Sequence, residues 1–277
     1  MTDYEQLLDA GAALGQRLLD SGAEIHRVED SVQRLLRSYG VEGEVFAIPN
    51  CLIVSFTGPD GHVYTRMLRA RVQGVNIEGI ERYNALSRRL CAAPPADTAC
   101  LLREVREAPA LRAYPMYIQL LGFLAGGFFF TLFFSGGLLE AAVGGLAGLC
   151  AGLTVLALGR RSRSNFFVNT TVAGFVLTLV VYAALLAGLD VNVEAIISGS
   201  IMTLVPGLVF TNALRDMIYG DISSGIHKCV QVLLIAGSMA LGSAAARNLT
   251  IQFWGPPGIA GTAAHSLGLL CFGAFLG

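Results

Sequence analysis

The stretch IMTLVPGLVFTNALRDMIYGDISSG, from Ile201 to Gly225, decides how the second half of the chain can fold. It is apolar enough to form a helix, yet it contains the pair Pro206-Gly207, followed closely by Thr, Asn, Arg and Asp. A proline in a helix interior removes an N–H group and clashes with the carbonyl four residues earlier, here that of Met202, at a cost of about 3 kcal/mol, and a glycine adds about 1 kcal/mol. We therefore predict that the helix kinks or breaks at this pair.

The composition predicts a membrane protein with a separate polar part. Hydrophobic residues make up 54% of the 277 residues and charged residues only 14%, which is unusual for a soluble domain. Of the 39 charged side chains, 28 lie within residues 1–115. The N-terminal segment MTDYEQLLDA lacks the basic start and apolar core of a secretory signal. We therefore expect the polar part to remain in the cytoplasm.

Residues 1–93 are expected to form a small α+β domain that opens with two helices. Apolar residues at helical spacing predict these helices near residues 4–18 and 25–39. Between them, Ser21 and Glu24 have the spacing of a capping box. In that motif the hydroxyl and the carboxylate each bind a free N–H group at the helix start.

Three strands and further helices are expected to complete the polar part. The segments EVFAIPN, CLIVSFT and HVYTRML have the residue types of strands, and TGPDG between the last two has the pattern of a tight turn. Helical spacing returns over residues 76–90, and residues 94–115 are expected to form a linker and a charged helix. The six cysteines show no C-x-x-C pairing, so we expect free thiols, no metal and no cofactor.

The remaining chain predicts an α-helical membrane domain over residues 116–250. A bilayer requires about 20 apolar residues for each helical span. Five segments meet this length, near residues 116–134, 137–158, 167–188, 194–214 and 227–246. A sixth apolar stretch within residues 251–277 is rich in Gly and Ala and carries His265, so it spans the membrane, re-enters it or lies at its surface.

The loops between these segments predict the orientation. Basic residues gather in GRRSRSN, at 159–165, and between Arg215 and Lys228, whereas the intervening loop LDVNVE has no basic residue. Basic loops face the cytoplasm in most multi-pass membrane proteins. This pattern also places residues 1–115 in the cytoplasm.

Small residues recur at every fourth position in two of the predicted spans. Gly144, Gly148 and Gly152 share one helix face, which favours close helix packing because small residues let two backbones approach. Thr170, Gly174 and Thr178 share a face of the next span. Their hydroxyl groups are compatible both with packing and with the lining of a route for a hydrophilic solute.

The broken helix at Pro206 predicts a solute site or an anchor. Irregular backbone at membrane depth is tolerated where protein groups or water satisfy it, and many transporters build their sites in this way. The alternative is a proline kink with an Arg-Asp pair at the membrane surface. The candidate transport residues are Thr203, Pro206, Gly207, Thr211, Asn212, Arg215, Asp216, Asp221 and Thr170.

Two motifs resemble those of one known family. LVPGLVFTNALRDMIYGDISSG (204–225) is similar to the signature of the threonine/serine exporter (ThrE) family, and GAEIHRVED (22–30) is similar to the motif that opens its cytoplasmic domain. Within the second motif, Glu24 is either a helix cap or a gating residue. Arg27 and Glu29 are expected to form an ion network at a domain interface.

This resemblance implies a subunit of a secondary exporter in the bacterial inner membrane. The arrangement is that of the YjjP-type subunits, which act with a small YjjB-type membrane subunit that supplies the second transmembrane half. The implied solutes are hydroxy amino acids such as threonine and serine, or C4 dicarboxylates such as succinate. We expect membrane lipid, a small-molecule substrate and a homo- or hetero-oligomer, but no nucleic acid.

Two other classes of function remain as alternatives. A non-transporting sensor or scaffold would bind a ligand through the polar part without moving solute. An intramembrane hydrolase is disfavoured, because ISGSI lacks a nucleophile elbow and no third group orients His227 or His265. The sequence also lacks a Walker A motif, so a proton or ion gradient is the expected energy source rather than ATP. We therefore do not expect an enzyme.

Overall fold

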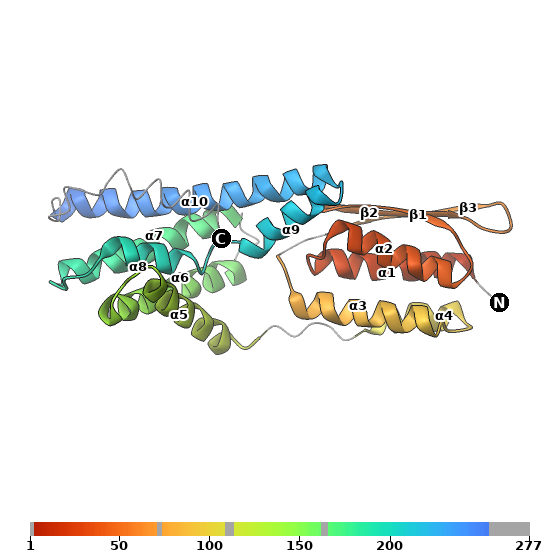
Figure 1. Ribbon diagram of the computed structural model, residues 1–277, viewed down its shortest axis with the longest axis horizontal. Coiled ribbons are helices and arrows are strands. Elements are labelled where there is room, and N and C mark those ends of the chain that lie inside the picture. The colour runs from red at the N-terminus through yellow and green to blue at the C-terminus, as the bar shows by residue number, and fades with distance from the viewer. Residues whose placement is uncertain (1–2, 71–73, 109–113, 162–165, 255–277) are drawn as a thin grey trace. The chain divides into compact units, whose positions relative to one another are not determined.

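A computed structural model describes residues 3–70, 74–108, 114–161 and 166–254 (Figure 1). The chain divides into two compact units. We call residues 1–112 and 208–229 the polar unit, and residues 113–207 and 230–277 the apolar unit. The predicted segment 251–277 lies almost entirely outside the described residues.

The polar unit contains a small antiparallel sheet and several helices. Its sheet has the strand order β1-β2-β3, with Val45 opposite Val54 and Val54 opposite Arg66. The predicted turn at TGPDG joins β2 to β3, and Gly61 there has a φ of +79°, which glycine adopts without strain. The bounds of its first elements are α1 Tyr4–Asp20, α2 Ile25–Ser38, β1 Gly43–Ile48, β2 Cys51–Thr57, β3 Val63–Arg69, α3 Ile77–Ala92 and α4 Thr98–Glu107.

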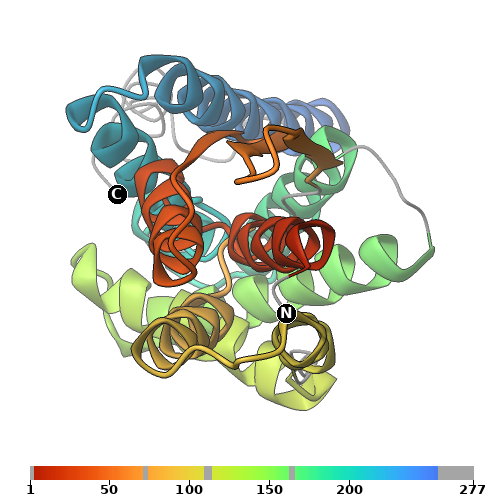
Figure 2. The same cartoon turned by 90° about the vertical axis from the view of Figure 1, so that its right-hand side faces the viewer.

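These elements form three layers, with α1 and α2 in the middle (Figures 1 and 2). The sheet covers one side of this helix pair, and α3 and α4 cover the other. The core therefore lies on both sides of the pair, and it includes Leu14 of α1, Leu35 of α2 and Leu52 of β2, each without exposed surface. This packing holds the start of α2 in a fixed position.

The apolar unit is built from long hydrophobic helices. Within the described residues, four helices are long and apolar enough to cross a membrane, namely α5 Met116–Phe133, α6 Leu138–Arg161, α7 Phe166–Leu186 and most of α10 Ile222–Trp254. The chain is thus mostly helical, as a multi-pass membrane protein requires. The predicted span at 194–214 is not a single helix but two short ones, α8 Val193–Ile201 and α9 Gly207–Ile218.

The glycine row of α6 packs against α5, as its spacing indicates. A Cβ atom added at Gly148 would lie 3.3 Å from the Cα atom of Gly127, and one added at Gly152 would meet the ring of Phe123. The two backbones can approach only because no side chains intervene. On α7, an added Cβ at Gly174 would lie 3.0 Å from the backbone oxygen of Met239 on α10, so that face also contains a close helix contact.

Candidate functional site

The helix break occurs where the Pro-Gly pair predicts it. Residues 202–206 form a turn between α8 and α9. The carbonyl of Met202 keeps a partner at the break, because the backbone N–H of Val205 donates to it at 3.3 Å. The hydroxyl of Thr203 donates to the carbonyl of Ser200 at 2.7 Å. Tight turns and a local side-chain bond therefore satisfy these groups without a ligand.

The turn is packed against α5 at one position. A Cβ atom added at Gly126 would lie 2.8 Å from the methyl group of Thr203, so a glycine on α5 makes room for the turn. Thr170 lies on α7, where it is 5% exposed and its hydroxyl donates to the carbonyl of Phe166 at 2.9 Å. Thr203 and Thr170 are therefore both in the apolar unit, the first in the turn after α8 and the second on α7.

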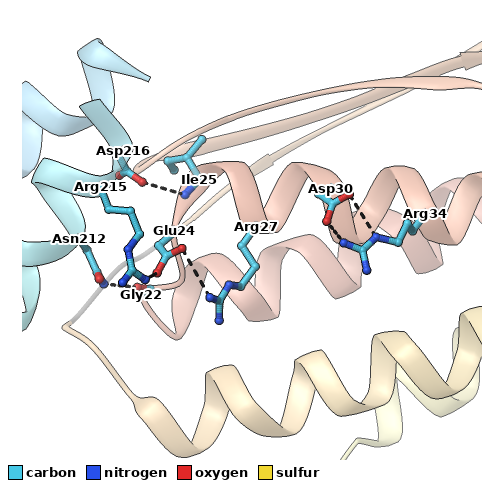
Figure 3. Close-up of polar contacts among 9 residues, drawn as sticks. All are labelled: Gly22, Glu24, Ile25, Arg27, Asp30, Arg34, Asn212, Arg215 and Asp216. Atoms are coloured by element: carbon cyan, nitrogen blue, oxygen red, sulfur yellow. Dashed lines mark hydrogen bonds and ion pairs between the residues drawn. The ribbon is translucent and has the colours of Figure 1, made fainter. Parts of the chain in front are cut away.

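The second half of the signature contacts the other motif within the polar unit (Figure 3). Asn212 Nδ2 donates to the carbonyl of Gly22 at 3.4 Å, and the guanidinium of Arg215 forms an ion pair with Glu24. The backbone N–H of Ile25 donates to Asp216 Oδ1 at 3.2 Å. One face of α9 thus binds the start of α2 by three polar contacts.

The predicted capping box is absent, which corrects the interpretation of Glu24. Ser21 has helical dihedrals (φ −80°, ψ −3°) at the end of α1, and its hydroxyl donates to the carbonyl of Arg17 at 2.7 Å. Glu24 occupies the N-cap position of α2, but its side chain makes no cap hydrogen bond. Its carboxylate instead pairs with Arg215 and, at 3.6 Å, with Arg27. Asp216, rather than Glu24, accepts a hydrogen bond from a backbone N–H at the start of α2, that of Ile25.

Asp216 also forms a buried ion pair that the sequence analysis missed. Lys228 Nζ, on α10, donates to Asp216 Oδ2 at 2.6 Å, and the two side chains are 9% and 1% exposed. Removal of one partner from such a pair leaves an uncompensated buried charge, and this lowers the stability of the folded protein by about 3–5 kcal/mol. The twelve-residue spacing of the pair spans the turn between α9 and α10, so no helical periodicity indicates it.

Glu29 is not part of an ion network within the described residues. Its Oε1 atom accepts a hydrogen bond from the backbone N–H of Ala47 at 2.8 Å, and this ties α2 to β1. Burial raises the pKa of the Glu29 carboxyl above its ordinary value, although the bond from Ala47 opposes this rise. Arg27, by contrast, is paired at 3.6 Å with Glu24, three residues before it in the chain.

Asp221 follows α9 in the turn that leads to α10. Its backbone N–H donates to the carbonyl of Asp216 at 2.9 Å, and Gly220 before it has a φ of +100°, which closes the end of α9. Burial, and secondly the charge of Asp216, raise the pKa of the Asp221 carboxyl. Asp221 is therefore easier to protonate than an ordinary aspartate.

An aromatic contact adds to the joint between the motifs. The imidazole ring of His26 stacks on the ring of Tyr219, with 4.9 Å between centroids and 8° between planes. Both residues lie within the quoted motifs, but a sequence pattern does not reveal the pairing. We call Gly22, Glu24, Ile25 and His26 with Asn212, Arg215, Asp216 and Tyr219 the motif joint. Within the described residues, no group of three or more His, Cys, Asp or Glu side chains could hold a metal ion.

Four apolar helices in the described residues indicate a multi-pass membrane protein, and a helix broken at Pro-Gly is a feature that many transporters share. The sequence profile of the family described as "Putative threonine/serine exporter" matches residues 9–250, and the chain belongs to that family. It is 26% identical over 245 residues to the "Probable succinate transporter subunit YjjP" of Klebsiella aerogenes, a match that covers 86% of this chain and 90% of that protein. The similarity to this transporter subunit thus extends over most of both chains. No solved structure matches it.

Proposed function

We propose that the chain is one subunit of a secondary exporter that moves a small hydrophilic metabolite out of the cell. Its solute is a hydroxy amino acid or a C4 dicarboxylate. The family description supports the first and the name of the relative supports the second. The observation that carries the proposal is the contact of the two family motifs with each other, directly after a helix break.

The helix α9 connects the break to the motif joint along the chain. It begins at Gly207 and carries Arg215 about 12 Å further along its axis, at 1.5 Å per residue. Because a short helix moves as a rigid rod, a change at the break alters the contacts that Arg215 makes. Solute in the broken segment and the position of α2 are therefore coupled through α9.

Arg215 provides the chemical link between solute and joint. Its side chain is 47% exposed although it pairs with Glu24. An entering solute carboxylate competes with Glu24 for the same guanidinium, which binds carboxylates in a bidentate manner. Thr203, Pro206, Gly207 and Thr211 form the continuation of the route, and solute binding releases the start of α2 from α9.

A gradient-driven exporter also needs a group that exchanges protons or ions. Asp216 binds Lys228 with one carboxylate oxygen and the N–H of Ile25 with the other, so both oxygens already have partners. Asp221 has a raised pKa and no ion pair within the described residues. Asp221 is thus the better candidate for proton coupling.

The partner in this proposal is a small YjjB-type membrane subunit. The relative is itself named a subunit, which supports a complex of more than one chain. In the complex, residues 1–115 lie in the cytoplasm and the break between α8 and α9 lies at membrane depth. The segment from Val193 to Ala213 has 21 residues, about the number that a helix needs to cross a bilayer. It forms two helices with a break between them rather than one continuous span.

The proposal is tested by solute efflux from proteoliposomes. The chain, the small membrane subunit and both together are reconstituted with labelled threonine, serine and succinate inside, with and without an imposed proton gradient. Gradient-dependent efflux of one solute is expected only when both proteins are present. Robust efflux by the chain alone would refute the need for a partner, and no efflux of any solute by the pair would favour a sensor or scaffold.

A further inference from the structure

The polar unit contains a cavity that the proposed transport route does not use. It has a volume of about 380 Å³ and lies between α2 and α3, with Tyr219 at one side. Ligand pockets in proteins start at roughly 300 Å³, so the space suits a small metabolite. The walls are mainly polar and charged, and they include Arg27 and Arg34 of α2 and Arg88 of α3.

The charges around the cavity are unbalanced in favour of the cations. Arg88 forms no ion pair within the described residues, and Arg34 pairs with Asp30. Arg27 shares the single carboxylate of Glu24 with Arg215. Four guanidinium groups therefore face two carboxylates at and beside the cavity wall. An anion bound here could therefore pair with Arg88, which has no ion pair within the described residues, and with Arg27, which shares its carboxylate.

The floor of the cavity offers neutral hydrogen-bond groups. Ser31, Asn84 and Ser87 line it and are only 7%, 9% and 5% exposed. The side chains of Ser31 and Asn84 make no hydrogen bond with the described part of the chain. Because both residues line the cavity, their polar groups are available to a ligand there. A hydroxyl and an amide both donate to oxyanions.

From the arginines, the buried polar floor and the volume, we infer that this cavity binds a small oxyanion, a carboxylate or phosphate metabolite, and that it is a regulatory site separate from the transport route. Arg88 and Asn84 contact the anion directly. Arg27 turns from Glu24 to the anion, because its ion pair with Glu24 is long, at 3.6 Å. Glu24 is then left to Arg215 alone, so the anion strengthens the motif joint.

Binding of inorganic phosphate and of succinate to the full chain in neutral detergent tests the inference, by isothermal titration calorimetry. The wild type is expected to bind at least one of the two, and Arg88→Gln to weaken that binding at least tenfold. Arg37→Gln is the matched control, since Arg37 is an exposed arginine of α2 that does not line the cavity. Binding of neither anion, or equal binding by Arg88→Gln and wild type, would overturn the inference.

A second arm distinguishes a soluble anion from a lipid headgroup. The titrations are repeated in nanodiscs of neutral lipid and in nanodiscs that contain anionic lipid. A soluble ligand binds in both, with the same dependence on Arg88. Binding that appears only when anionic lipid is present would overturn the regulatory metabolite site. Because these measurements need no flux, their result is independent of the outcome of the efflux experiment.

Discussion

The carboxylate of Asp216 caps the N-terminus of α2 by accepting a hydrogen bond from the backbone N–H of Ile25, 191 positions away in the sequence. The same carboxylate binds the buried ammonium group of Lys228 at 2.6 Å. One aspartate thereby connects α2, α9 and α10 within the polar unit. The joint between the two family motifs depends on this residue more than on any surface ion pair.

Loss of Asp216 should therefore destabilise the protein strongly. Asp216→Ala leaves the Lys228 charge buried without a partner, and about 3–5 kcal/mol of stability is expected to be lost. The double variant Asp216→Ala with Lys228→Met should be less destabilised than Asp216→Ala alone, because no charge remains buried. Thermal unfolding in detergent, followed by circular dichroism, measures both. Asp30→Ala, which removes a surface pair with Arg34, should change stability by at most about 1 kcal/mol.

The ion pair between Glu24 and Arg215 should be needed for transport. Arg215→Ala is expected to reduce efflux by the reconstituted complex at least tenfold, because both the solute contact and the joint are lost. The charge exchange Glu24→Arg with Arg215→Glu should restore the joint but not the solute contact. Crosslinking of α2 to α9 should therefore be lower in Arg215→Ala than in the wild type and should return in the exchanged variant. Efflux should stay low in both variants. Recovery of full efflux in the exchanged variant would show that Arg215 does not contact solute.

Asn212→Ala tests the neutral part of the same face. It removes the 3.4 Å bond to the carbonyl of Gly22 and a polar group beside the route. We expect efflux to fall at least tenfold while the protein inserts and assembles normally, since the carbonyl of Gly22 loses a partly buried hydrogen bond and the route loses a polar group. Gln33→Ala, a polar-to-alanine change on α2, serves as the control. Wild-type efflux with Asn212→Ala would assign this side chain to packing.

Pro206→Ala should slow turnover without loss of expression. Alanine restores the backbone N–H group and removes the ring clash, so α8 and α9 can join into one straighter helix. Solute efflux rates at saturating solute are the measurement, with Pro95→Ala in the loop before α4 as the control. If Pro206→Ala transports at the wild-type rate, the break is only an anchor, and the α7 face that carries Thr170 becomes the better candidate for the route.

The glycine row of α6 predicts a position-dependent effect within one helix. Gly148→Val should impair folding, because an added Cβ would lie 3.3 Å from the Cα atom of Gly127 and closer still to the backbone of Phe123. Gly159→Val on the same helix should be tolerated, since an added Cβ there meets no atom within 4 Å. The yield of monodisperse protein after size-exclusion chromatography in detergent compares the two. Equal yields would contradict the close packing of α5 and α6.

Several local features follow from the sequence alone, because each depends on neighbouring residues. The helix break at Pro206 and Gly207 follows from a missing N–H group and a ring clash, which no tertiary contact can remove. The turn between β2 and β3 follows from TGPDG in the same way. The spacing of the glycines also predicted the packing face of α6. A row of residues without side chains leaves a groove in which a neighbouring helix can lie close.

The tertiary structure decided the partners of the charged residues. Ser21 and Glu24 have the spacing of a capping box, but Ser21 belongs to the end of α1, and Gly22 with a φ of +77° turns the chain before α2. Local spacing offers Glu24 several partners, and only the fold brings Arg215 to it from far along the chain. From the sequence alone Asp216 was likewise only a candidate transport residue, and the fold places it between Ile25 and Lys228. Ion pairs between distant segments are set by packing of the helices that carry them, and that packing is a property of the whole fold rather than of any short stretch.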